Sequence, residues 1–227
     1  PVARIWDVNR RRVVRRITGP SSGIASVAYS KNGKWIALGG LDGSVKIVKA
    51  ATGKVTRTIK AHNAQVTGVA FSLDAKSVVS GGWDKQVLLW DVKSGKRKHK
   101  FKGVKKLVGS LALSRDGRFL AASLGSRIRV WNFKTKRKLW YLKGHDDHIH
   151  DLDFAPGVAI LASASQDWSV RLWDINKGIE RREIKGHQFG VKGVAFSNDG
   201  SRLASASLDF TARLWDVRTS NERRRLE

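Results

Sequence analysis

The sequence contains no cysteine, no methionine and only three prolines. Without cysteine the chain has no disulfide framework, no thiol nucleophile and no cysteine ligand for zinc. The same absence leaves the redox compartment undetermined, because no thiol remains to be oxidised.

Long apolar runs are also missing. No segment approaches the roughly 18 consecutive apolar residues that a membrane span requires, and no secretory signal opens the chain. Because the sequence begins PVARIWDV, without an initiator methionine, we expect it to be part of a longer protein. With 227 residues and a hydrophobic content of 41%, it can form one substantial globular domain or a repeat array.

Acidic residues are scarce relative to basic ones. The 19 Asp and Glu residues face 44 Lys and Arg residues, which leaves a formal net charge of +25. This excess is far larger than solubility requires. It favours polyanionic partners such as RNA, DNA, acidic proteins or anionic membrane surfaces.

The sequence repeats with a period of about 42 residues. Strand-like segments carry Trp90, Trp131, Trp173 and Trp215, which are 41, 42 and 42 residues apart. Counting from Trp6, the same period reaches Val48 and then Trp90, so it survives where the tryptophan is lost. Upstream segments such as SKNGKWIALGG and SNDGSRLASAS combine short apolar runs with Gly, Asp and Ser. This pattern indicates short strands joined by tight turns.

A unit of this length, with Gly-His near its start and Trp-Asp near its end, resembles the WD40 repeat of the β-propeller family. The resemblance covers essentially the whole chain and implies an all-β fold of four-stranded blades, with strands a to d and strand d outermost. We expect one WD40 propeller domain over 1–227, with strands c and d of a partial blade at 1–17. Five complete blades follow, at 18–59, 60–102, 103–143, 144–185 and 186–227. Because an incomplete ring leaves strand edges unpaired, we expect the parent protein to contain more blades. The resemblance implies a parent ring of seven blades, or six.

WD40 blades share a hydrogen-bonded tetrad of His, Ser or Thr, Asp and Trp. A buried indole N–H needs an acceptor, and a buried imidazole needs partners on both nitrogens. Three blades carry the full set, namely His62, Ser80, Asp84 and Trp90; His145, Ser163, Asp167 and Trp173; and His187, Ser205, Asp209 and Trp215. Blade 18–59 keeps only Asp42 and blade 103–143 keeps only Trp131. We expect those two blades to be held by apolar packing alone and to be more mobile.

The same residue types form Ser–His–Asp catalytic triads. Here the set recurs three times with a tryptophan attached, which a structural role explains and catalysis does not. The chain also has no P-loop and no GxSxG motif. We therefore expect no enzyme activity and no cofactor.

The segment GHDDHIHD, at 144–151, holds three of the six histidines and has the composition of a metal site. In the repeat frame, however, His145 belongs to a tetrad, and Ile149 and Leu152 fall at apolar positions of strand a. The remaining loop residues are too few to bind a metal tightly. We therefore predict no metal site and a polar loop that contacts a partner.

Most of the positive charge lies in strand d and its flanking turns. Six windows, at 10–16, 54–60, 93–102, 134–143, 177–185 and 218–225, hold 27 of the 44 basic residues and only three acids, Glu180, Glu183 and Glu222. We predict a basic outer rim that consists of Arg11, Arg12, Arg97, Lys98, Arg137, Lys138, Arg181, Arg182, Arg224 and Arg225. Such a rim suits phosphate contacts, and Trp140 and Tyr141 would add stacking surfaces. Edge-strand protection also uses charges, but it does not explain why they share one sign.

A second candidate surface is the face that bears the d–a and b–c loops, where WD40 proteins often bind partners. This candidate partner face contains Trp83, Gln166, Trp168, Phe189, Leu208, Phe210, Asp146, Asp147 and His148. Aromatic residues at exposed turns suit binding hot spots, although they would also suit packing between blades.

The two surfaces lead to two functional hypotheses. The first is a non-catalytic scaffold that binds proteins or peptides on the candidate partner face and assembles complexes, without membrane insertion. The alternative is an RNA-binding, nucleic-acid-binding or ribonucleoprotein-assembly subunit that uses the basic outer rim. In either case we expect an intracellular protein, in the cytoplasm or the nucleus.

Overall fold

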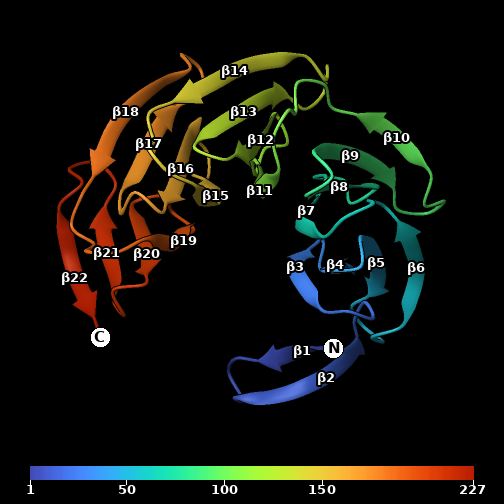
Figure 1. The fold of residues 1–227 in the computed structure, drawn as a ribbon. Coiled ribbons are helices and arrows are strands. Elements are labelled where there is room, and N and C mark those ends of the chain that lie inside the picture. Colours follow the sequence, from blue (N-terminus) through green and yellow to red (C-terminus); the bar gives the residue numbers. More distant parts are fainter. The chain divides into compact units, whose positions relative to one another are not determined.

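The computed structural model describes residues 1–227 and consists of β-structure. Five four-stranded antiparallel sheets and one two-stranded sheet are present, which confirms the predicted all-β class with five complete blades and two strands of a sixth (Figure 1). No helix in the chain is long and apolar enough to cross a membrane.

The chain divides into two compact units, and the first unit is Pro1–Lys102. It contains the two-stranded sheet, which is the partial blade, and the sheets of blades 18–59 and 60–102. Its strands are β1 (Val2–Asp7), β2 (Arg12–Thr18), β3 (Ile24–Tyr29), β4 (Trp35–Gly40), β5 (Ser44–Lys49), β6 (Val55–Lys60), β7 (Val66–Phe71), β8 (Ser77–Gly82), β9 (Gln86–Asp91) and β10 (Arg97–Lys100).

The second unit, Gly103–Glu227, contains the sheets of blades 103–143, 144–185 and 186–227. Its strands are β11 (Val108–Leu113), β12 (Phe119–Leu124), β13 (Arg127–Asn132), β14 (Lys138–Lys143), β15 (Ile149–Phe154), β16 (Ile160–Ser165), β17 (Val170–Asp174), β18 (Ile179–Ile184), β19 (Val191–Phe196), β20 (Arg202–Ser207), β21 (Ala212–Asp216) and β22 (Glu222–Leu226).

Each sheet follows the chain order, so its first strand forms one edge and its fourth strand forms the other (Figure 1). The first strands of neighbouring sheets lie next to one another, as β11, β15 and β19 do in the second unit. Among the middle strands, β8 and β12, with their apolar and small residues, are buried throughout. The fourth strands are largely exposed, and every residue of β22 is exposed. The lateral order therefore places the most basic segments at the solvent edge of each sheet.

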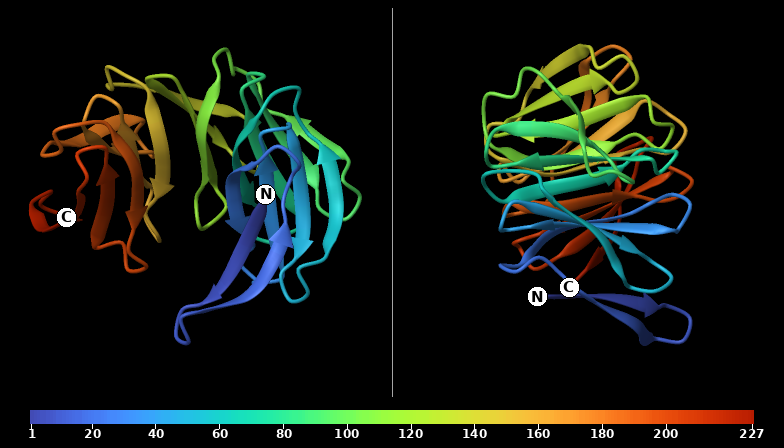
Figure 2. Two further views of the ribbon diagram at one scale, coloured as in Figure 1. Left: turned by 60° about the horizontal axis from the view of Figure 1, so that its bottom comes forward. Right: turned by 90° about the vertical axis from the view of Figure 1, so that its right-hand side faces the viewer.

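Neighbouring sheets within a unit lie side by side (Figure 2), and they share cores of buried apolar residues. In the first unit one core joins Ile47 of β5 to Val66 of β7 and Trp90 of β9. In the second unit another core joins Val130 of β13 to Trp173 of β17. Because one core serves two sheets, each blade depends on its neighbour for burial of its apolar surface.

Polar side chains also connect neighbouring sheets near a β-bulge in the first strand. Asp151 of β15 accepts a hydrogen bond from the Val194 amide at 3.1 Å, and Asp153 accepts one from the Phe196 amide at 2.8 Å. Burial raises the pKa of both carboxyl groups, and the amide donors oppose that rise. These two acids therefore join β15 to β19 at some electrostatic cost.

Candidate interaction surfaces

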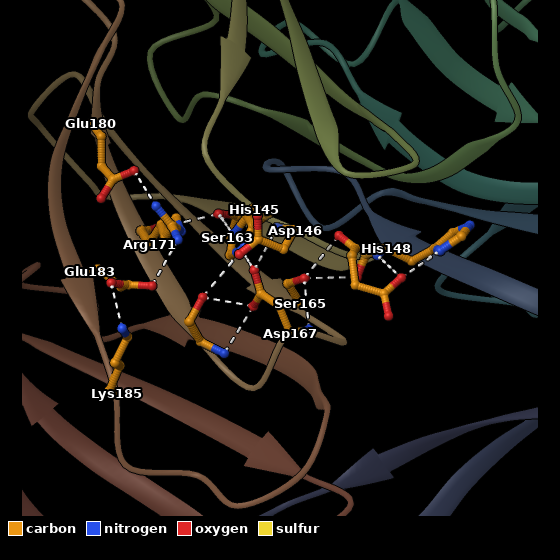
Figure 3. A network of polar contacts seen from close by, with 12 residues as sticks. His145, Asp146, His148, Ser163, Ser165, Asp167, Arg171, Glu180, Glu183 and Lys185 are labelled. Carbon is orange, nitrogen blue, oxygen red and sulfur yellow. Dashed lines mark hydrogen bonds and ion pairs between the residues drawn. The ribbon is translucent and has the colours of Figure 1, made fainter.

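In blade 144–185 the four tetrad side chains form one continuous chain of hydrogen bonds. Figure 3 shows three of them, His145, Ser163 and Asp167. The His145 Nδ1 atom lies 2.7 Å from Asp167 Oδ2, and its Nε2 atom lies 2.7 Å from Ser163 Oγ. The Trp173 indole donates to the same Ser163 oxygen at 2.8 Å. The backbone keeps Ser163 close to Trp173, because Ser163 of β16 pairs directly with Arg171 of β17 and Trp173 lies two residues further along that strand.

The other two tetrads repeat this geometry closely. Their His–Asp distances are both 2.8 Å, their His–Ser distances are both 2.7 Å, and their Trp–Ser distances are both 2.8 Å. The members are His62, Ser80, Asp84 and Trp90 in blade 60–102, and His187, Ser205, Asp209 and Trp215 in blade 186–227.

The proton positions follow from the acceptors. A carboxylate next to Nδ1 requires an N–H there, so a neutral imidazole must accept at Nε2. The serine hydroxyl donates to that nitrogen and accepts from the indole, which satisfies every member. Ser163 is 0% exposed, so its oxygen is out of reach of any substrate. The arrangement is that of a structural network.

The pKa values of the tetrad reflect the balance of burial and hydrogen bonding. Burial disfavours ionisation of Asp167, but hydrogen bonds from His145 and Ser169 outweigh it and hold the pKa well below its ordinary value. Asp209 behaves in the same way, with Thr211 and His187 as donors. Burial lowers the pKa of His62 against the opposing effect of Asp84. These shifts favour an ionised Asp167, an ionised Asp209 and a neutral His62 near pH 7.

The expectation that the two other complete blades rely on apolar packing alone is wrong. In blade 18–59, Asp42 accepts hydrogen bonds from the Ser44 hydroxyl at 2.6 Å and the Ser21 hydroxyl at 2.8 Å. Burial raises the pKa of Asp42, but these bonds lower it to about 2. In blade 103–143, the buried Ser123 hydroxyl oxygen accepts from the Ser110 amide at 2.7 Å. Both blades thus keep short polar networks that the tetrad pattern did not reveal.

The candidate partner face of the second unit exposes large aromatic side chains. Phe210 is 93% exposed, and Trp168, Phe189 and Leu208 are each about half exposed. Trp168 and Phe210 occupy the left-handed region, with φ values of 71° and 64°. Bulky residues rarely adopt this conformation. Trp168 contacts Phe189 of the following blade, with 6.1 Å between ring centroids, whereas Phe210 projects into solvent.

The acidic loop lies at the same end of the strands. The Asp146 amide donates to Asp167 at 3.1 Å, and Asp147 accepts from the backbone amide of His148 at 2.6 Å (Figure 3). A hydrogen bond from the His148 side chain lowers the pKa of Asp147. All three loop side chains are exposed, and no group of residues in the chain has the geometry of a metal site. In the first unit, Trp83 is 48% exposed at the corresponding loop.

One polar cluster near this face was not identified from the sequence. Gln166, a predicted partner-face residue, contacts His150 at 2.9 Å and Lys192 at 2.9 Å, and Lys192 also contacts His150 at 2.8 Å. Gln166 is therefore held by its neighbours rather than free. The only sequence signal was that His150 and Lys192 share one position in consecutive repeats.

A second feature missed from the sequence is a pair of strand-c arginines. Arg171 binds Glu180 at 2.6 Å and Glu183 at 2.7 Å (Figure 3). Arg213 binds Glu222 at 2.7 Å. Both arginines are largely buried, with side chains 13% and 9% exposed. The sequence did contain a signal for these pairs. Each arginine lies two residues before the strand-c tryptophan of its blade, and a glutamate lies seven residues after that tryptophan.

These pairs leave the basic outer rim without compensation from its own acids. The three acids of the strand-d windows pair with Arg171 and Arg213 of strand c, and Glu183 also pairs with Lys185 at 3.1 Å, which is not one of the ten rim residues. All ten rim residues are exposed on fourth strands or adjoining turns. Lys98 lies 3.7 Å from Asp91, and Arg225 lies 3.1 Å from Glu227. The other eight form no ion pair.

The two aromatics beside the rim differ in accessibility. Trp140 donates its indole N–H to the Ile175 carbonyl at 2.7 Å, and its ring lies against Gly178. It therefore links neighbouring blades and is not free for stacking. Tyr141 is 40% exposed, and the Arg129 guanidinium lies 4.3 Å from its ring centroid.

A scan of known protein families matches the WD domain, G-beta repeat (WD40) five times, at residues 11–49, 53–91, 95–132, 136–174 and 178–216. Each match begins near strand d of one blade and ends in strand c of the next, so its frame differs from the sheet frame by one strand. Among curated proteins no match was found. The five matches cover well over half of the chain and coincide with its repeated sheets, and the chain therefore belongs to the WD40 repeat family.

Proposed function

We propose that this chain is a non-catalytic scaffold that binds a protein or peptide on the candidate partner face of its second unit. WD40 domains generally bind proteins. The observation that carries the proposal is Phe210, an aromatic residue that is 93% exposed in a left-handed turn. Folding gains nothing from either property, so a role in binding accounts for them better than packing does.

The partner's chemistry follows from the surroundings of this patch. Trp168, Phe189, Leu208 and Phe210 offer aromatic and aliphatic surface for an apolar anchor. The loop residues Asp146 and Asp147 lie at the same strand ends and add negative charge to a chain of net charge +25. A peptide with an apolar anchor next to a lysine or arginine fits both features.

The test is site-specific photo-crosslinking from positions 168 and 210, with Val158 as the control position. Val158 is also apolar and 53% exposed, but it lies in an a–b turn at the other end of the strands. The same partner must crosslink at 168 and 210 and not at 158. Phe210→Ala should then weaken that partner by about thirtyfold, as expected for a hot spot. Equal crosslinking at all three positions would contradict the proposal.

A second candidate function is polyanion binding by the basic outer rim, including RNA binding within a ribonucleoprotein assembly. It is favoured by the ion-pair pattern, because the acids of the outer strands pair with the strand-c arginines and eight of the ten rim residues form no ion pair. Contacts of this kind neutralise phosphates, release counterions and carry no sequence information.

Binding of an unstructured RNA across a salt series tests this role. A steep loss of affinity with salt is expected, and Glu substitutions at 96–98 and 136–138 should reduce the slope. Absence of binding at low salt would exclude the role. Phe210→Ala should leave RNA binding unchanged, which separates the two functions.

A further inference from the structure

Blade 103–143 concentrates positive charge with almost no acid. It contains eleven basic residues and one acid, Asp116. That acid is bound by Arg118 in the a–b turn. Among the other cations, Arg127, Arg129, Lys138 and Lys143 lie on the two strands β13 and β14 and form no ion pair. The same blade is the one that lacks His, Ser and Asp of the tetrad.

The neighbouring blade 144–185 has carboxylates next to the equivalent arginine, and blade 103–143 lacks them. Arg129 is two residues before Trp131, as Arg171 is before Trp173. In blade 144–185 the positions that face this arginine carry Glu180 and Glu183. In blade 103–143 the same positions carry Lys138 and Tyr141. One strand-c arginine therefore has two carboxylates, and the other has an ammonium group and an aromatic ring.

The side chains of Arg129 and Lys138 converge in space. A Cβ atom placed on Gly103 would lie 3.0 Å from Lys138 Cδ and 3.5 Å from Arg129 Nε. At the equivalent Gly144, the nearest atoms include Glu180 Oε2 at 2.7 Å and Arg171 Nη1 at 3.0 Å. The lysine thus occupies the place where the neighbouring blade has a carboxylate.

The surroundings supply no other counter-charge. The Arg129 guanidinium donates only a long bond of 3.5 Å to the Trp140 carbonyl and lies over Tyr141. Next along the strands, Arg127 and Lys143 are directly opposite each other. Like charges in this position destabilise a strand pair, so an anion that bridged them would remove a cost as well as form new bonds.

We propose that Arg129 and Lys138, with Arg127 and Lys143 beside them, form a binding site for a phosphate group. The phosphate oxygens replace the missing carboxylates and accept from the guanidinium and the ammonium group. This site is distinct from the candidate partner face. If the phosphate belongs to a nucleic acid, the site is part of the proposed polyanion function and rests on it. A free phosphate or a phosphate monoester would bind through the same contacts, and the site would then be independent of that function.

The test compares Lys138→Glu with Arg137→Glu in the full chain. Both variants change the net charge equally. Lys138→Glu gives Arg129 a carboxylate at the position that Glu180 has next to Arg171 in blade 144–185, whereas Arg137 is an exposed rim residue with no ion pair. Thermal unfolding and calorimetric titration with inorganic pyrophosphate are measured at constant ionic strength, with chloride as the reference anion.

Pyrophosphate should stabilise the wild type and Arg137→Glu. Lys138→Glu should weaken pyrophosphate binding by about tenfold or more. Arg129→Gln should weaken it as much, although this variant introduces no carboxylate. Equal weakening in Lys138→Glu and Arg137→Glu would reduce the effect to general charge and overturn the site. Absence of any pyrophosphate effect on the wild type would overturn it as well.

A short single-stranded RNA distinguishes the source of the phosphate. If the site binds a nucleic acid backbone, Lys138→Glu should weaken RNA more than Arg137→Glu does. If both variants weaken RNA equally while only Lys138→Glu weakens pyrophosphate, the site binds a free phosphate or a monoester. If the wild type binds pyrophosphate but does not bind RNA, the result contradicts the polyanion function of the rim and leaves the phosphate site standing.

Discussion

Blades 103–143 and 144–185 are neighbours in one unit and share one apolar core, yet their polar interiors differ almost completely. Both bury the strand-c tryptophan, with Trp131 at 0% and Trp173 at 2% exposure. Only the second blade surrounds that tryptophan with His145, Ser163 and Asp167. Blade 103–143 has in its place only a short polar network, in which the Ser123 hydroxyl accepts from the Ser110 amide. The comparison shows that the full tetrad is not required to place the four strands, and that it adds stability and directional order where it is present.

The largest expected effect comes from breaking the tetrad at its centre. Ser163→Ala removes both the acceptor for the Trp173 indole and the donor to His145, and leaves two buried polar groups without partners. The free energy of unfolding should fall by about 3 kcal/mol. Chemical denaturation measures this, with the exposed Ser201→Ala as the control. A cost no greater than that of Ser201→Ala would mean that blade 144–185 needs its network as little as blade 103–143 does.

The next effect reverses the charges around the strand-c arginine. Glu180→Lys gives blade 144–185 the lysine that blade 103–143 carries at this position, and leaves Arg171 with one carboxylate, Glu183, and a nearby ammonium group. Because Glu180 is 31% exposed, solvent screens part of the loss, and a decrease of about 1 kcal/mol is expected. Lys138→Glu should raise the stability of blade 103–143 by a similar or smaller amount. The two variants are compared by amide exchange in β13 and β17, and changes of the same sign would contradict the equivalence of the two sites.

Much of this comparison was accessible from the sequence. The tryptophan period, the Gly-His pairs and the turn residues locate the blades, because each strand must alternate to bury one face and each turn needs its own backbone geometry. The tetrad spacing also identified which three blades hold the full set. These features are local or periodic, so they are visible in one chain.

Other features depend on contacts between repeats, and the sequence pattern did not predict them. Trp140 resembled a stacking surface until the structure placed its indole on the Ile175 carbonyl of the next blade. The sequence pattern assigns Glu180 and Glu183 to an exposed outer strand. In the structure they form ion pairs with Arg171 of strand c. Such contacts require knowledge of which side chains cross from strand d to strand c, and composition alone does not contain that information.

A smaller effect concerns the b–c turn, where the blades again differ. The left-handed position is Gly125 in blade 103–143 and Phe210 in blade 186–227. Phe210→Asn should raise the free energy of unfolding by about 1 kcal/mol, because asparagine tolerates this conformation and a bulky residue does not. Gly125→Ala should lower it by about 1 kcal/mol for the opposite reason. Both are measured by chemical denaturation, and a loss of stability in Phe210→Asn would show that the phenylalanine packs against the fold.

The smallest effect is a pH dependence in which a tetrad histidine and the buried acids act in opposite directions. The pKa of His62 is lowered by burial, so below about pH 6.5 the unfolded chain binds the proton first and stability falls with decreasing pH. The pKa of Asp151 is raised by burial, so the folded chain takes up that proton first and stability rises as pH decreases toward that pKa. Asp151→Asn should therefore steepen the loss of stability in acid, measured as the free energy of unfolding between pH 7.5 and about 4.5. An unchanged slope would show that Asp151 titrates alike in both states, and the amide of Val194 would then balance the cost of its burial.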